Sequence, residues 1–207
     1  SSIGNGATVN ALGNAAGISV RTGAFDVDFN TLYSSDPGQV KPVAVNNGNA
    51  TDASLTHERN SVADTRTGFT GVAVTAINQD DIGSYAIGVG GAGTVAIQIS
   101  ATVNALTANT TATIADNARV NTATSGEGAM QSVLVAAGND FSRVAVAGGL
   151  SISGVVAVTP GADVAVVTTN AKASIGSNAE VQAQRDVEVL ANSDVDILSI
   201  AISVAGS

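Results

Sequence analysis

The strongest constraint on the fold of this 207-residue chain is a ten-residue block that occurs three times. The first copy, Ser-Ile-Gly-Asn-Gly-Ala-Thr-Val-Asn-Ala, begins at Ser2, and related copies begin at Thr113 and Ser174. The last two copies lie 61 residues apart, which indicates a period of about 60 residues. Recurring β-branched runs separated by Gly, Asn and Asp are typical of a solenoid, in which each unit buries its apolar face against its neighbours. The chain is therefore expected to be a stack of similar units.

A second block, which starts with Asp, also recurs, at Asp81, Asp140 and Asp196. The two intervals between these starts are nearly equal and agree with the same long period. Within the block, apolar residues are spaced two apart, as at Val133 and Val135, and this alternation predicts β-strands. With three coils between them, the three Asp side chains would lie about 14 Å apart, too far to share a metal ion. We therefore interpret them as turn residues that bind local backbone amides.

These patterns predict an all-β fold, a parallel β-helix (a β-solenoid) with about 20 residues per coil and one irregular insertion. The predicted coils occupy residues 1–24 and 67–207, and the inserted loop region occupies residues 25–66. At about 4.8 Å per coil, about eight coils would form a rod roughly 40 Å long. Because the sequence starts and stops inside repeats, we expect the chain to be a fragment of a longer solenoid.

The composition fits a narrow core. Hydrophobic residues make up 44% of the chain and aromatic residues only 3%, and Ala and Val supply most of the former. Ladders of Val and Ile are expected to fill the interior, with Ala and Gly at the corners. No stretch keeps the apolar stripe of a helix for three turns, and the 23 Gly residues would weaken one.

The net charge of −9 argues against a nucleic-acid partner, because the eight Lys and Arg residues form no basic face. The same charge disfavours anionic membranes, and no apolar run is long enough for us to expect membrane insertion by this segment. The absence of Cys excludes disulfides and thiolate metal sites without deciding the compartment. An acidic surface with few aromatic residues suits an extracellular protein.

The insertion at residues 25–66 contains several of the aromatic residues, which are rare in this chain, and its only His. Loops that leave a solenoid are free of its packing demands and often carry binding. Two interpretations stay open, a solvated decoration without a partner and a recognition loop. The candidate binding residues of the second interpretation are Phe25, Phe29, Tyr33, His57 and Arg59.

Three carboxylates in the same insertion form a candidate metal site. Asp26, Asp28 and Asp36 could supply the oxygen ligands that calcium prefers, although their spacing fits no EF-hand loop. Calcium is the single cofactor that the sequence suggests, and the alternative is that the chain binds none.

Catalysis is not expected. His57 is the only His and no nucleophile motif accompanies it. A carbohydrate-cleaving β-helix enzyme would need two acids facing one groove, and only Asp194 and Asp196 are close in sequence and share a strand face. No aromatic sugar platform lies near them in the sequence, so we do not predict an enzyme.

The repeated Ile-Gly-x-x-Ala-x-Val block, the run from Asn109 to Ile114 and the long Ala, Val, Gly and Ser stretches resemble the passenger repeats of large bacterial filamentous adhesins, of the filamentous haemagglutinin and leukotoxin type. The resemblance covers the chain outside the insertion and is one of style and periodicity. It implies a right-handed parallel β-helix that is exported and displayed as a fibre at the bacterial cell surface.

Together these observations predict a structural or adhesive rod segment of a large secreted bacterial surface protein, which displays loops for attachment to host or neighbouring cells. The alternative is a self-assembling extracellular filament or sheath, in which the partners are copies of the chain itself.

Overall fold

The computed structural model describes residues 1–30, 58–122 and 125–207, and within these ranges every regular element is a β-strand. The all-β prediction is confirmed. The strands are β1 (Ser2–Ile3), β2 (Thr8–Val9), β3 (Ile18–Asn30), β4 (Glu58–Ala92), β5 (Val95–Ile97), β6 (Ser100–Ile114), β7 (Arg119–Val120), β8 (Gln131–Ser153), β9 (Val156–Val158), β10 (Gly161–Ile175), β11 (Glu180–Val181) and β12 (Val187–Gly206).

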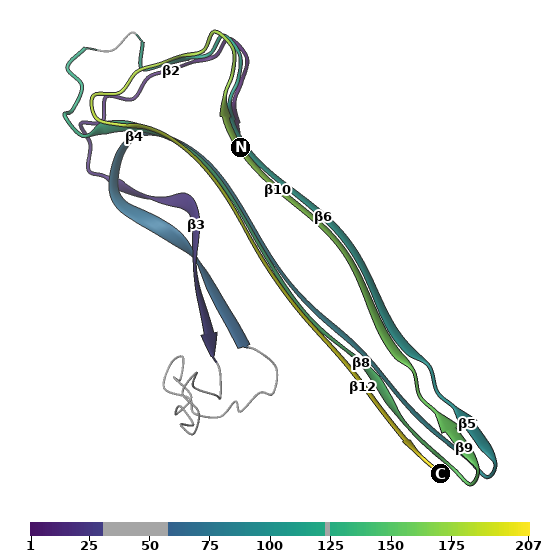
Figure 1. Cartoon of the computed structure of the whole chain (residues 1–207). Helices are drawn as coiled ribbons and strands as arrows, with labels where there is room; N and C mark the ends of the chain where they lie inside the picture. The colour runs from purple at the N-terminus through teal and green to yellow at the C-terminus, as the bar shows by residue number, and fades with distance from the viewer. Residues whose placement is uncertain (31–57, 123–124) are drawn as a thin grey trace.

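The strands form four sheets. The long sheet has the order β12-β8-β4-β3, the return sheet β1-β6-β10 and the short sheet β11-β7-β2, while β5 and β9 form a separate pair. All pairings are parallel except the antiparallel pair of β3 and β4. Figure 1 shows β4, β8 and β12 side by side along one long curved path, and β6 and β10 side by side along a second path.

The strand register gives the length of the chain path between neighbouring strands. Thr70 of β4 pairs with Gln131 of β8, and Ser100 of β6 with Gly161 of β10, so paired residues are 61 positions apart. The shift between β8 and β12 is 54 positions, as in the pair of Val133 and Val187. The predicted long period is correct, whereas its predicted division into short coils, and with it the stack of about eight coils, is wrong.

The register also corrects the alignment of the Asp blocks. Asp81 pairs with Ser142 rather than with Asp140, and Asp196 also pairs with Ser142. The predicted alignment is therefore misplaced by two positions, an error that leaves every side chain on its original face and so keeps the apolar alternation intact. Asp81, Asp140 and Asp196 lie inside long strands, so their interpretation as turn residues is wrong.

The core contains the predicted ladders of Val and Ile. One ladder joins Val74 and Val135, which are 4% and 0% exposed, across the long sheet. A second joins Ile114, which is fully buried, to its pairing partners Ile3 and Ile175 in the return sheet. These ladders pack into one cluster with Ala112, Ala118 and Val120, so the core lies where the long, return and short sheets meet.

The repeated ten-residue block forms the same corner three times. Gly6, Asn117 and Asn178 hold equivalent positions with φ of 66°, 56° and 56°, the left-handed conformation that Gly and Asn tolerate best. Asn121 follows this corner at the end of β7. Its side-chain oxygen accepts a hydrogen bond from the amide of Ala11 at 2.9 Å, and its Nδ2 donates to a carbonyl of the next layer. The corner therefore has the same backbone in each layer, and the side-chain amide of Asn121 joins its layer to the two neighbouring ones.

One buried ion pair connects the long sheet with the return sheet. Arg143 of β8 donates to both carboxylate oxygens of Asp163 of β10, with Nη1 at 2.8 Å from Oδ2, and the two side chains are 0% and 5% exposed. Thr102 and Ser199 also donate to this carboxylate. Hydrogen bonds from Arg143 and then Thr102 hold the pKa of Asp163 far below its ordinary value. The carboxylate thus contacts side chains of β6, β8 and β12 and fixes how the two sheets lie against each other.

Candidate functional site

The candidate site is an antiparallel hairpin that leaves the parallel strands. It consists of β3 and residues 58–69, the first part of β4, and its pairs run from Ile18 with Phe69 to Asn30 with Glu58. It holds both ends of the predicted insertion, although its strands extend beyond the predicted bounds of residues 25 and 66. In Figure 1 the hairpin departs from the curved path of β4 near the junction with the short sheet.

Glycines permit this departure. β4 continues from the hairpin into the long sheet through Gly68 and Gly71, which have φ of +69° and +124°. A Cβ at Gly71 would overlap the backbone of Ser132 on β8. Within the hairpin, Gly23 lies against Gly138 so closely that a Cβ on Gly138 would overlap the carbonyl group of Gly23. The hairpin can therefore cross β8 with its backbone in direct contact with the strand.

An apolar cluster holds the base of the hairpin on the outer face of β8. Phe69 and Val20 are 4% and 8% exposed, and they pack against Leu134 and Ala136, which are fully buried. Burial of such side chains contributes about 1.5–3 kcal/mol each. The base of the hairpin is thus a packed part of the molecule.

Two arginines of the hairpin reach two neighbouring strands of the long sheet. Arg66 binds Glu188 of β12 through two hydrogen bonds of 2.6 and 2.7 Å, and this bond lowers the pKa of Glu188. Arg59 donates to both oxygens of Asp140 of β8, and these two side chains are 5% and 0% exposed. The hairpin is therefore joined to β8 and β12 at separate points.

Arg59 lies among the three aspartates of the repeated block. Its hydrogen bond with Asp140 raises the pKa of the guanidinium most, and the negative charges of Asp140, Asp196 and Asp81 raise it further, while burial opposes them. The sequence predicts that Arg59 faces a binding partner, but its guanidinium is held in this intramolecular ion pair. Its role in the structure is to anchor the hairpin.

The other predicted binding residues divide into two groups. Phe25 is half-buried on β3, opposite Ala63, and Phe29 pairs through its backbone with Arg59. Tyr33 and His57 lie outside the described residues, so the structure does not bring the predicted set together.

The predicted calcium ligands are likewise only partly described. Asp26 is exposed on β3 and pairs with Val62, and the backbone of Asp28 pairs with Asn60. Asp36 lies outside the described residues. Within residues 1–30, 58–122 and 125–207, no group of three His, Cys, Asp or Glu side chains is placed to hold a metal ion. Calcium therefore stays a prediction without a described ligand set.

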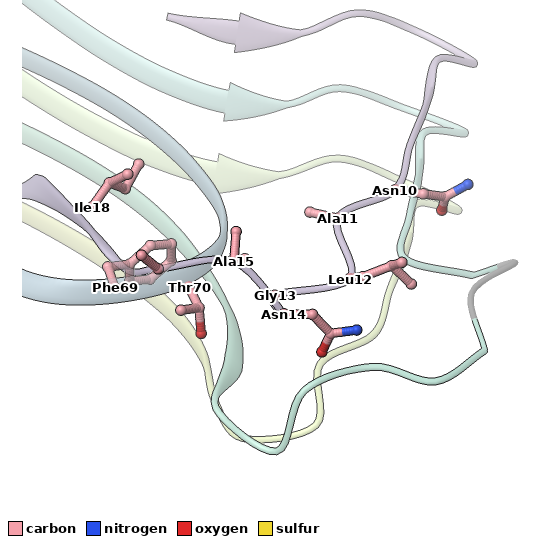
Figure 2. A pocket seen from close by; sticks show the side chains of 11 residues that line it. Asn10, Ala11, Leu12, Gly13, Asn14, Ala15, Ile18, Phe69 and Thr70 are labelled. Atoms are coloured by element: carbon pink, nitrogen blue, oxygen red, sulfur yellow. The ribbon is translucent and has the colours of Figure 1, made fainter.

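A pocket of about 550 Å³ opens beside the base of the hairpin. Figure 2 shows its wall, in which the chain from Asn10 to Ala15 borders the space next to Ile18, Phe69 and Thr70. None of these lining residues is ionisable, so the pocket offers apolar contacts and amide or hydroxyl hydrogen bonds rather than acid–base chemistry. Leu12 and Ile18 at its rim are 46% and 61% exposed.

Two further pockets flank the hairpin and carry its charges. One of about 570 Å³ lies between residues 22–24 of β3 and residues 190–192 of β12, and Asp64 and Arg66 also line it. The other, of about 350 Å³, places Arg66 and Glu188 beside Arg185 and Asp186. Both pockets are lined by positively and negatively charged side chains. Neither pocket therefore has a single sign of charge that would select an ion.

Sequence reasoning missed the residues that anchor the hairpin. The anchoring residues lie in strands with the usual alternation of apolar and polar residues, and nothing in that pattern marks them: Arg66, Phe69, Asp140 and Glu188. Asp140 is also 81 residues from its partner Arg59. The one available signal is the position of Arg66 and Phe69 at the end of the insertion, where the chain must rejoin the repeat.

No protein family model matches this chain, and neither the curated proteins nor the solved structures include a significant match. Among the described residues, no helix is long and apolar enough to cross a membrane.

Proposed function

We propose that this chain is a structural rod segment of a large secreted bacterial surface protein, and that the β3–β4 hairpin is its attachment element. The rod is a parallel β-solenoid in which each coil contains one long strand, one strand of the β5–β9 pair, one return strand and one short strand. The observation that carries this proposal is the register of 61 positions that is shared by the pairs β4–β8, β6–β10 and β7–β11.

The hairpin suits attachment because it interrupts the sequence repeat while the parallel strand pairing continues on both sides of it. Thr113 of β6 pairs with Ser2 on one side and with Ser174 on the other, so the first coil is the longer of the two. Its extra length corresponds to the hairpin and the segment it encloses, and the pairing on either side of them stays parallel. Exposed residues such as Asp26 and Val62 lie on the hairpin strands. Many copies of such an element along a rod would combine weak contacts through effective concentration.

Bead adhesion under flow tests this proposal. Beads coated with the chain should be retained on an epithelial cell monolayer better than beads coated with albumin. A variant with Asp26→Arg and Val62→Asp changes the exposed face of the hairpin, and its retention should fall towards the albumin level. Tyr85→Ser, at a site on β4 that is 65% exposed, is the matched control and should retain binding. Equal retention of chain-coated and albumin-coated beads would refute the adhesive role.

A second candidate function is a self-assembling filament. It is favoured by one specific observation: large apolar side chains of the long sheet, such as Ile87, Val89 and Ile202, are 73%, 74% and 56% exposed. Lateral packing of copies would cover these side chains. Negative-stain electron microscopy separates the two functions, because isolated thin particles support the displayed rod and ordered fibres support the filament.

A further inference from the structure

The coil has an uncharged end, the end at which β5 and β9 lie in Figure 1. This end comprises residues 82–107, 143–168 and 197–207, which the strand register places side by side. Its only charged residues are Arg143 and Asp163, which form the buried ion pair and neutralise each other. The whole net charge of −9 therefore lies in the rest of the chain.

Along β8 the large apolar side chains change from the inner to the outer face as the strand enters the uncharged end. The odd-numbered residues face the interior, where Val135 belongs to the core cluster and Ser151 donates a hydrogen bond to a carbonyl of β5. Between them, Ala145 is also 0% exposed. The even-numbered residues face outward, and at the uncharged end Leu150 and Ile152 are 40% and 59% exposed. Because β8 has a paired strand on each side, this exposure belongs to the outer face of the sheet and not to its edge.

The interior of the uncharged end is narrow. A Cβ at Gly88 would overlap the side chain of Gln98, and a Cβ at Gly149 would overlap that of Thr159. Large apolar side chains instead lie outside, on the long sheet, on the β5–β9 pair and on the return sheet. Two examples from each of these three surfaces are 46% to 74% exposed: Ile87, Ile202, Ile97, Val158, Val103 and Val166.

We infer that the uncharged end binds the surface of a lipid bilayer that has no net charge, with its outer side chains in the layer between headgroups and acyl chains. A fluid lipid phase fits because it covers apolar side chains on three surfaces at once, whereas a rigid partner covers one. A second copy fits less well, because copies packed side by side would bring their acidic parts together. The contact stays at the interface, since the connection from β4 to β5 lies outside the paired strands and such backbone is not tolerated in the hydrocarbon core.

This surface is separate from the hairpin, so the inference goes beyond the proposed function and does not depend on it. The acidic remainder of the chain disfavours anionic membranes, and headgroups without net charge avoid that repulsion.

Flotation of the full 207-residue chain with phosphatidylcholine vesicles tests the inference. The chain should float with these vesicles, and it should bind phosphatidylglycerol vesicles more weakly at low salt. Ile87→Asp with Ile97→Asp places charges on two surfaces of the uncharged end. This variant should lower the lipid partition coefficient about a hundredfold, because each isoleucine that leaves the lipid forfeits about a factor of ten. Thr111→Asp with Asn170→Asp adds the same charges at exposed positions outside the uncharged end, and this matched control should float like the parent chain.

Tryptophan fluorescence gives a second readout, because the chain contains no Trp. The emission of Ile97→Trp should shift to shorter wavelength when phosphatidylcholine vesicles are added, and brominated acyl chains should quench it. Thr111→Trp, outside the uncharged end, should show neither change.

Three outcomes would overturn the inference. The first is a parent chain that does not float and an Ile97→Trp emission that vesicles leave unchanged. The second is equal flotation of the two Asp double variants, which would place the contact elsewhere. The third is assembly into ordered multimers that leave the vesicles free, which would support lateral packing of copies.

The hairpin variant with Asp26→Arg and Val62→Asp separates this inference from the proposed function, and it should float like the parent chain. Flotation of a chain whose beads are retained no better than albumin-coated beads would refute the attachment role and leave lipid binding standing.

Discussion

Replacing Asp163 with Asn tests how strongly the buried carboxylate joins the two large sheets. The substitution keeps the size of the side chain but leaves Arg143, which is 0% exposed, without its negative partner. Removing one member of a buried ion pair costs about 3–5 kcal/mol, because the other charge stays buried and unpaired. For a chain of this size, 1 kcal/mol corresponds to about 2–4 °C in Tm, so Asp163→Asn should lower Tm by about 6–20 °C.

Urea unfolding followed by circular dichroism at pH 7 measures the change. Asp186→Asn is the matched control, because Asp186 pairs with Arg185 at 3.0 Å on the surface, where the two side chains are about half exposed. Exposed ion pairs contribute about 0–1 kcal/mol, so this control should unfold almost like the parent chain. Joint replacement by Asp163→Leu and Arg143→Met should restore most of the lost stability, since no charge is then left buried. Equal stability of Asp163→Asn and Asp186→Asn would refute the role given to the buried pair.

Three further predictions concern pH, the hairpin anchor and the glycine junction. Because hydrogen bonds hold the pKa of Asp163 below the unfolded value of about 3.9, its stabilisation is complete above that pH and is lost as the pH falls through the folded value. Acid unfolding of Asp163→Asn should accordingly show a shallower pH dependence than that of the parent chain. Phe69→Ala should cost about 3–5 kcal/mol in urea unfolding, whereas Tyr85→Ala should change stability by no more than about 0.5 kcal/mol. Gly71→Ala should cost more than about 1 kcal/mol and increase proteolytic cleavage of the hairpin, because its φ is +124° and Ser132 occupies the space; normal stability and protease resistance would contradict this account.

The strands and their period follow from the sequence, but the lengths of the individual strands do not. Alternating apolar residues mark strands wherever they occur, and the ten-residue block fixes the period. Gly83, Gly88 and Gly90 suggest breaks between short strands, yet all three lie inside the continuous strand β4. At Gly88 a Cβ would overlap the side chain of Gln98, so the glycine permits close packing rather than a turn.

The sequence predicts where along the chain the candidate site lies, but it does not predict which residues hold the site together. The loss of the repeat between residues 25 and 66 indicates where the chain leaves the parallel strands. The pairing of Arg59 with Asp140 depends on contacts across 81 residues, which local patterns do not encode. Aromatic and acidic residues in an irregular segment favour a binding loop, whereas the described part of that segment is a paired hairpin fixed by Arg–carboxylate contacts.

The position of the hairpin separates the sequence of the enclosed segment from the register of the long sheet. The chain leaves the layer at Ile18 and returns at Phe69, and these residues pair with each other, so the enclosed segment begins and ends at one point of the layer. A segment of different length or composition could replace it without shifting the register of β4 against β8. If the hairpin is the attachment element that we propose, what it binds could change through this junction while the register and spacing of the paired strands stay constant.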